Sequence, residues 1–165
     1  MVRQAVRAAL FTLMTIAALL AAPLASGAPA APHLAITLVP ESASPAAGSD
    51  VALAFAAVPA AGWHGYWKNP GDAGVETRAE WTLPAGVRAA PLDYPVPQRL
   101  VIAGLMNHVY ERPFALLPRL SLPAGLAKGT RVPVAAKLDY LVCTTELCVP
   151  ETQTPSAVLT IGDGA

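Results

Sequence analysis

Residues 132–150 read VPVAAKLDYLVCTTELCVP, and this stretch decides the fold that the sequence predicts. Larger apolar side chains alternate with alanine or charged residues along Val132–Val142, and a period of two is typical of a half-buried β-strand. The strand leads into Cys143, and Cys148 follows after four residues. If Cys143 ends one strand and Cys148 begins the next, a hairpin places them opposite each other. Such cross-strand neighbours lie about 4.5–5.5 Å apart, which suits a disulfide.

The same strand pattern recurs along the chain and predicts an all-β protein. Seventeen prolines and twelve glycines separate short apolar runs and argue against long helices. The expected strands are 34–39, 51–55, 63–68, 77–83, 114–122, 132–142 and 157–161. This spacing of alternating runs favours an antiparallel β-sandwich.

Prolines mark where the strands are expected to turn or break. Asn69-Pro70-Gly71-Asp72 has proline at the second position and glycine at the third, as a type II turn requires. Pro118 and Pro133 interrupt two expected strands, which predicts edges or bulges there.

The first thirty residues have the pattern of a secretory signal peptide. Arg3 and Arg7 precede an apolar run over 8–24, and small residues follow, so we expect a signal peptide over 1–28, give or take a few residues, and one domain over 31–165. Pro23 and the small residues argue against an uncleaved membrane anchor.

The domain that remains after cleavage is expected to be periplasmic. Removing two arginines from 11 basic and 11 acidic residues leaves 9 against 11, a net charge of −2, which argues against a nucleic-acid partner. No second apolar span follows, so no membrane insertion is expected after cleavage. The sequence fits either a free-standing protein, for which a monomer is the default, or the first domain of a longer one.

The two cysteines allow two interpretations. As a staple, a disulfide that closes a loop of roughly six residues would contribute only about 2 kcal/mol. As a reagent, a local hairpin disulfide near the surface is suited to thiol–disulfide exchange. Glu146 between the cysteines disfavours a thiolate, and the C-x-x-C motif of thioredoxin-type sites is absent. The residues alone leave both interpretations open.

The stretch Tyr94–Asn107 is unusually apolar for a loop that begins with two prolines. It is either a strand with a bulge at Gly104 or a lid that covers a site. A lid is considered because an apolar loop with nothing to cover would expose an apolar patch. Both interpretations stay open at this point.

Four segments together resemble a known family. They are Gly62–Gly74 (GWHGYWKNPGDAG), Glu80–Pro84, Asn107–Tyr110 and the cysteine stretch from Asp139 to Glu151. In these segments the chain resembles the N-terminal periplasmic domain of DsbD-type thiol:disulfide interchange proteins, nearest the branch of the ScsB-like suppressor-of-copper-sensitivity proteins. The resemblance covers nearly all of 31–165.

The resemblance implies an immunoglobulin-like antiparallel β-sandwich with the cysteine pair on a hairpin. It implies that Cys148 carries the mixed disulfide and that Cys143 resolves it. It places a protective cap at about Leu100–Gly104, with Ile102 at its centre. The further residues that it assigns to the site are His64, Tyr66, Tyr110 and Glu146.

The resemblance also implies partners. Electrons would come from a thioredoxin-like periplasmic domain that a DsbD/ScsB-type membrane electron conduit recharges, and they would pass to periplasmic acceptors such as disulfide isomerases or cytochrome c maturation thioredoxins. No cofactor is expected. Two rivals remain, a binding or assembly module with a structural disulfide and a periplasmic copper-binding protein. Met106, His64 and His108 lack the spacing of metal ligands, so we expect no metal site.

Overall fold

The computed structural model describes residues 31–164. The expected signal peptide over 1–28 and its cleavage site lie outside the described residues. The domain expected over 31–165 stays a prediction at its boundaries, although residues 31–164 do cluster as one compact unit. Within this part of the chain, no helix has the length and apolar character needed to cross a bilayer.

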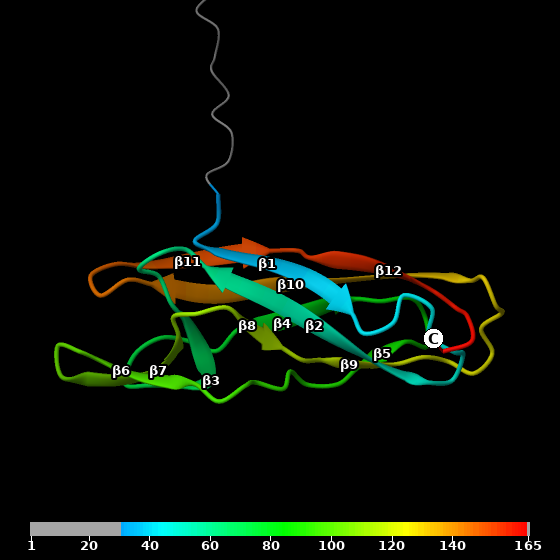
Figure 1. Cartoon of the computed structure of the whole chain (residues 1–165), viewed down its shortest axis with the longest axis horizontal. Helices are drawn as coiled ribbons and strands as arrows, with labels where there is room; N and C mark the ends of the chain where they lie inside the picture. Colours follow the sequence, from blue (N-terminus) through cyan, green and yellow to red (C-terminus); the bar gives the residue numbers. More distant parts are fainter. Residues whose placement is uncertain (1–30, 165) are drawn as a thin grey trace, which may run out of the picture. The chain divides into compact units, whose positions relative to one another are not determined.

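The described residues form twelve β-strands and no helix (Figure 1). The strands are β1 Leu34–Pro40, β2 Asp50–Pro59, β3 Gly65–Gly71, β4 Arg78–Thr82, β5 Arg88–Ala89, β6 Gln98–Ile102, β7 Leu105–Tyr110, β8 Phe114–Leu116, β9 Arg119–Ser121, β10 Arg131–Cys143, β11 Cys148–Gln153 and β12 Ser156–Thr160.

These strands pair antiparallel in three sheets. One runs β1-β2-β9-β5 with β8 also on β2, the second runs β11-β10-β12 with β4 on the other edge of β10, and the third runs β3-β7-β6. The all-β, immunoglobulin-like antiparallel β-sandwich expected from the sequence is confirmed.

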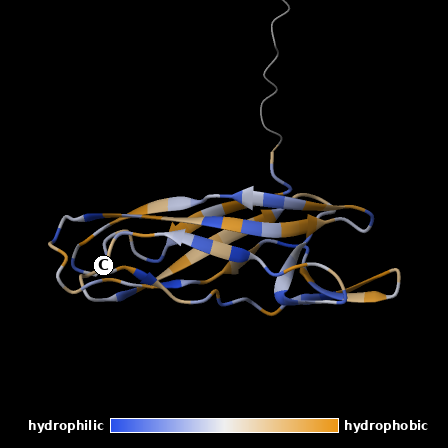
Figure 2. Cartoon of the chain, turned by 180° about the vertical axis from the view of Figure 1, so that it is seen from behind, coloured by the Kyte–Doolittle hydropathy of each residue, from blue (hydrophilic) through white to orange (hydrophobic). Residues whose placement is uncertain are grey.

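The core lies between the sheets because the strands alternate inward and outward side chains. β10 and β2 bury every second residue along most of their length. Figure 2 shows strands in which hydrophobic and hydrophilic residues alternate. Phe55, Leu120, Leu138 and Leu159 are fully buried in the main cluster. Each such side chain contributes roughly 1.5–3 kcal/mol relative to an exposed one.

β10 is the strand that positions the cysteines. Its first half pairs with β12, its second half pairs with β11, and β4 covers the middle of its other edge. Thirteen residues of this strand are therefore held by three neighbours before it ends at Cys143. The last residue of such a strand is held firmly by the sheet.

Three local expectations need correction. The strand expected over 114–122 is two short strands, β8 and β9, which keep one register along β2. The interruption falls at Pro118, which has no N–H to donate, although its carbonyl accepts a hydrogen bond from the Leu53 N–H at 2.9 Å. The type II turn expected at Asn69–Asp72 is the bulged end of β3, which continues through Gly71 (φ 93°) beside β7. Gly104 is part of a hairpin turn and not a bulge, as described below.

The Tyr94–Asn107 stretch contains most of a hairpin, in which β6 and β7 pair from Gln98–Val109 to Ile102–Leu105. Ala103 and Gly104 connect them with φ values of 50° and 86°. Two successive positive φ values define the type I′ turn, whose twist matches that of the two strands. The β6–β7 and β10–β11 hairpins end at the same end of the sandwich, on the left in Figure 1.

Candidate active site

Cys143 and Cys148 form a disulfide across the β10–β11 hairpin, with an S–S distance of 2.08 Å and a Cα–Cα distance of 4.1 Å. The backbone N–H and C=O of Cys143 both bond to His64, at 3.0 and 2.8 Å, and so point away from Cys148. The cysteines are therefore a non-hydrogen-bonded pair, the ladder position at which facing side chains are closest. The conditional expectation that Cys143 ends one strand and Cys148 begins the next is met.

The loop between the cysteines is ordered by Thr144. Its Oγ1 accepts hydrogen bonds from the backbone N–H groups of Glu146 (3.1 Å) and Leu147 (3.0 Å), and its own N–H donates to the Leu147 carbonyl at 2.7 Å. A threonine hydroxyl that replaces a backbone acceptor in this way is a common turn device. Glu146 is exposed at the tip of the loop.

The two sulfur-bearing residues differ in exposure. Cys143 is only 1% exposed, whereas Cys148 is an exposed residue at the start of β11. A disulfide is opened by a thiolate that must approach one sulfur in line with the bond. On this hairpin an incoming group can reach Cys148, while the sheet covers Cys143.

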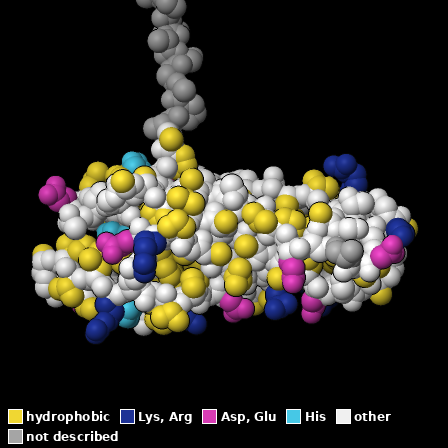
Figure 3. Space-filling view, viewed as in Figure 1, with side chains coloured by type: hydrophobic (Ala, Val, Ile, Leu, Met, Phe, Trp, Pro, Cys, Tyr) yellow, Lys and Arg dark blue, Asp and Glu magenta, His cyan; other side chains and the backbone are white. Residues whose placement is uncertain are grey.

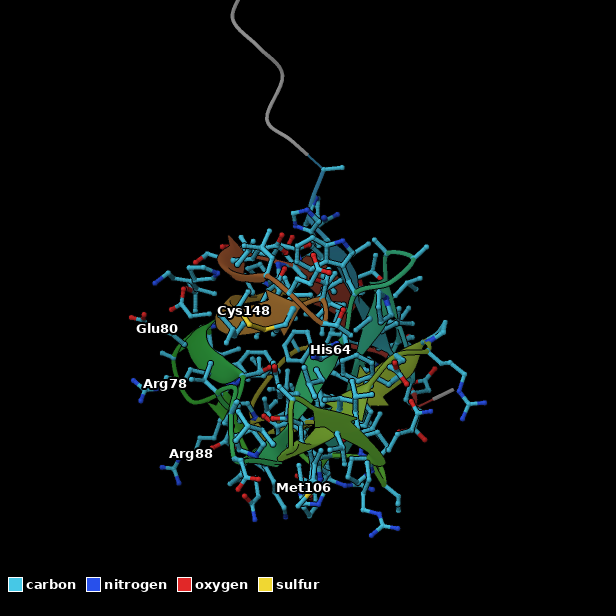
Figure 4. The ribbon with its side chains drawn as sticks, turned by 90° about the vertical axis from the view of Figure 1, so that its left-hand side faces the viewer. His64, Arg78, Glu80, Arg88, Met106 and Cys148 are labelled. Atoms are coloured by element: carbon cyan, nitrogen blue, oxygen red, sulfur yellow. A yellow bond between two sulfur atoms is a disulfide. The ribbon has the colours of Figure 1, made fainter. Side chains whose placement is uncertain are left out.

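A small buried cluster lies around Cys143. It consists of Tyr66, Val109 and Cys143, with Leu100 and Leu141 packed against it. Figure 4 looks onto this end of the molecule, with Cys148 and His64 in its upper half and Met106 at the bottom. Of the residues that the family resemblance assigns to the site, Tyr66 lies in this cluster. Leu100, from the segment expected to form the cap, packs against the cluster.

Tyr66 on β3 and His64, the residue just before β3, form a buried pair. His64 is 2% exposed and Tyr66 is 4% exposed, with 3.3 Å between His64 Nε2 and the Tyr66 hydroxyl. Burial lowers the pKa of His64, and the charge of Glu111 opposes this only in part. Burial raises the pKa of Tyr66. Both side chains are therefore neutral at pH 7.

The other expected site residues lie in different places. Ile102 is half-buried next to the β6–β7 turn, and Gly104 in that turn has open space around it. Tyr110 stacks on Phe114 with 4.1 Å between ring centroids and donates a hydrogen bond to the Pro95 carbonyl at 2.7 Å. Because Tyr110 and Val109 are successive residues of one strand, Tyr110 faces away from the Cys143 cluster.

A polar network that the sequence did not reveal fixes β11 to the start of β1. Glu151 Oε1 accepts hydrogen bonds from the His33 backbone N–H at 2.9 Å and contacts His33 Nδ1 at 2.6 Å, while Glu151 Oε2 accepts from the Tyr140 hydroxyl at 2.8 Å. Gln153 joins the network through Tyr140 and the Leu34 carbonyl. Burial alone would raise the pKa of Glu151, but these hydrogen bonds outweigh it and the pKa is lowered.

Of the residues considered for a soft-metal site, His64 lies beside Cys143, but Met106 and His108 do not gather there. Met106 lies well apart from Cys148 in Figure 4, and His108 Nδ1 is 2.9 Å from the Asn69 carbonyl oxygen. Within 31–164 no group of three or more His, Cys, Asp or Glu side chains is arranged to hold a metal ion.

The surface at this end is mixed in character. Val101, Leu105 and Leu147 are 64%, 48% and 56% exposed at the tips of the two hairpins. Figure 3 shows apolar patches among scattered charges of both signs on the face toward the viewer. Exposed apolar side chains at the tips of these hairpins are suited to contact with another protein rather than with a highly charged ligand.

The fold and the site together define an immunoglobulin-like β-domain with a disulfide on a hairpin, exposed at Cys148 and buried at Cys143. The family comparison agrees with this class. The sequence profile of the family described as "Thiol:disulfide interchange protein DsbD, N-terminal" matches residues 36–160. The chain belongs to that family, as its sequence indicated.

A solved structure supports the fold. The N-terminal periplasmic domain of ScsB from Proteus mirabilis superposes with a TM-score of 0.59 at 18% identity, over 78% of this chain and 47% of that one. This chain therefore spans about half the length of the ScsB structure that it matches. The reduced DsbD N-terminal domain of Neisseria meningitidis matches with a TM-score of 0.36 and 12% identity, over 79% of this chain and 86% of that chain. No curated protein sequence matches the chain.

Proposed function

We propose that this chain is a periplasmic thiol–disulfide exchange domain that passes two electrons through Cys143 and Cys148. The observation that carries the proposal is the unequal exposure of the two residues, with Cys148 open and Cys143 1% exposed, in a member of a thiol:disulfide interchange family. A purely structural bond has no need of an accessible sulfur at a hairpin end.

The exchange is a pair of thiolate displacements. A thiolate of the reducing partner attacks Sγ of Cys148, the bond to Cys143 breaks, and Cys143 leaves with the electron pair and takes up a proton. A second partner thiolate then attacks the mixed disulfide and releases Cys148. The partner ends as a disulfide and this domain as a dithiol, which the reverse sequence oxidises at an acceptor protein.

The partners that fit are thioredoxin-like periplasmic domains. The donor would be one that a DsbD/ScsB-type membrane electron conduit recharges, and the acceptors would be periplasmic proteins that must be kept reduced. The domain would work as a monomer, because it has to present the same hairpin to both partners in turn. In this role the protein is an oxidoreductase component that needs no cofactor.

The β6–β7 hairpin is proposed as the cap. Leu100 packs against the Cys143 cluster, and Ile102 and Gly104 lie at the end of the same hairpin. A reduced pair in an oxidising compartment would otherwise react with any oxidant, so a cap that yields only to a docked protein protects the electrons.

A trapping experiment tests the proposal. Cys143→Ala leaves only the exposed Cys148, and the matched variant Cys148→Ala leaves only the buried Cys143. Each is mixed with a thioredoxin-like periplasmic domain that lacks its resolving cysteine and carries a thionitrobenzoate leaving group. Cys143→Ala should form the covalent complex at least about tenfold faster, because reactivity follows access to the sulfur. No complex with Cys143→Ala would overturn the proposal and leave a structural bond.

A further inference from the structure

His64 lies directly opposite Cys143 across the sheet. The isolated antiparallel bridge between them exchanges both backbone hydrogen bonds, His64 N–H to the Cys143 carbonyl at 2.8 Å and Cys143 N–H to the His64 carbonyl at 3.0 Å. Directly opposite residues of an antiparallel pair point to the same face, with Cβ atoms about 4.5–5.5 Å apart. Cys148, Cys143 and His64 therefore form a row of three neighbouring side chains on one face.

The middle of this row is sealed from water. Cys143 is 1% exposed and His64 is 2% exposed. Tyr66, itself 4% exposed, packs in one cluster with Cys143 and meets the His64 ring edge-on at 5.3 Å between centroids. Exchange requires Cys143 to lose a proton when it attacks and to gain one when it leaves. Where water is excluded, a protein group has to accept that proton in the transition state, as in general base catalysis.

His64 is in the right form for this task. Burial lowers its pKa, so the imidazole is neutral and can accept a proton. Tyr66, whose hydroxyl is 3.3 Å from Nε2, orients the ring and stays neutral itself. Glu111 is the charged group that acts on His64, and its carboxylate favours the imidazolium that forms when the proton arrives.

We propose that His64 is the proton acceptor for Cys143 during resolution of the mixed disulfide, an inference that rests on the proposed exchange function. The Cys143 thiol attacks Sγ of Cys148 in the Cys148–partner disulfide. Its S–H proton passes to the imidazole, the Cys143–Cys148 bond forms, and the partner leaves as a thiolate with the electron pair. The imidazolium then gives this proton to the departing partner thiolate, which restores the neutral imidazole.

The two displacements can be timed with a chromogenic disulfide. Reduced protein is mixed with one equivalent of dithionitrobenzoate. Attack by Cys148 releases the first thionitrobenzoate, and resolution by Cys143 releases the second. The variants are His64→Gln and His64→Asn, and His108→Gln is the matched control, because His108 lies on β7 and its Nδ1 faces the Asn69 carbonyl.

The expected result is a change confined to the second release. In the unaltered protein and in His108→Gln, the second rate should be nearly constant above about pH 7, because burial holds the pKa of His64 below 6.5 and the base is neutral there. In the His64 variants it should be at least about tenfold slower at pH 7. It should also rise about tenfold per pH unit, because only the small thiolate fraction of Cys143 then reacts. The first release should not change.

Two results would overturn the inference. One is a second release in both His64 variants with the same rate and pH profile as in the unaltered protein. The other is an equal slowing of both releases, which would indicate a structural role for His64. The trapping experiment with Cys143→Ala separates this failure from failure of the proposed function, since Cys148 can capture a thioredoxin-like domain whether or not His64 accepts the proton.

Discussion

Gly74 gives a direct test of how the buried cluster around Cys143 is built. Its φ is +93°, a conformation that side chains rarely adopt, and a Cβ atom added there would overlap the ring of Tyr66. Gly74→Ala must therefore both strain the backbone and displace the ring that covers His64 and Cys143. The change alters one methyl group in a loop without touching either cysteine.

The magnitude follows from two separable effects. A non-glycine residue in the left-handed region costs about 1–2 kcal/mol. Overpacking against a buried ring costs a further 1–3 kcal/mol, roughly. Gly129 is the matched control, because its φ is +86° and a Cβ there would meet nothing within 4 Å. Gly129→Ala should lose only the first amount, and Gly74→Ala the sum of both, about 2–5 kcal/mol.

Urea unfolding of the oxidised proteins measures both free energies, and alkylation of the reduced proteins reports on the cover over Cys143. Gly74→Ala should be the less stable variant by about 1–3 kcal/mol and should expose Cys143 to the alkylating reagent, whereas Gly129→Ala should not. Equal losses of stability in the two variants, with Cys143 equally protected, would refute the packing that we assign to Tyr66.

Three further predictions concern charge and access. Glu151→Gln should lower the free energy of unfolding by about 1.5–3 kcal/mol at pH 7, the range for hydrogen bonds to a charged group. In the unaltered protein this stability is present above the ordinary pKa of 4.5 and is lost as the pH falls through the lowered pKa of Glu151. The free energy of unfolding in urea should therefore change less with acid pH in the variant than in the unaltered protein. Because the pKa of His64 is lowered below 6.5, the unfolded chain binds the extra proton; unfolding free energy should fall as the pH drops below about 6.5, and His64→Gln should remove that slope. Ile102→Asp should raise the rate at which oxidised glutathione oxidises the reduced pair by about tenfold if the β6–β7 hairpin is a cap, and an unchanged rate would exclude a shielding role for that side chain.

The sequence predicted those parts of the fold that depend on local alternation. Val132–Val142 was expected as a strand, and β10 runs over Arg131–Cys143, because a strand buried on one face must repeat its apolar residues every two positions. The spacing of Cys143 and Cys148 made a hairpin between them possible, and the family resemblance implied it.

Features that depend on long-range contacts were not predictable. The partners in the His33–Glu151 pair are 118 residues apart, and nothing near either residue signals the other. The β6–β7 turn uses Ala103 at φ 50°, a position where glycine, asparagine or aspartate would have signalled a tight hairpin. For the site, sequence likeness assigned Tyr110 beside the cysteines, whereas the alternation of β7 turns Val109 toward them.

The central claim is that the Cys143–Cys148 bond opens and closes under physiological reductants. Equilibration of the purified protein with glutathione redox buffers, with the fold followed by circular dichroism, measures the reduction potential of the pair. The account predicts a potential between about −180 and −270 mV, in the range of exchange-active thioredoxin-like proteins, with an intact fold in both states. A potential below about −300 mV, or unfolding on reduction, would contradict it and identify the disulfide as a structural bond.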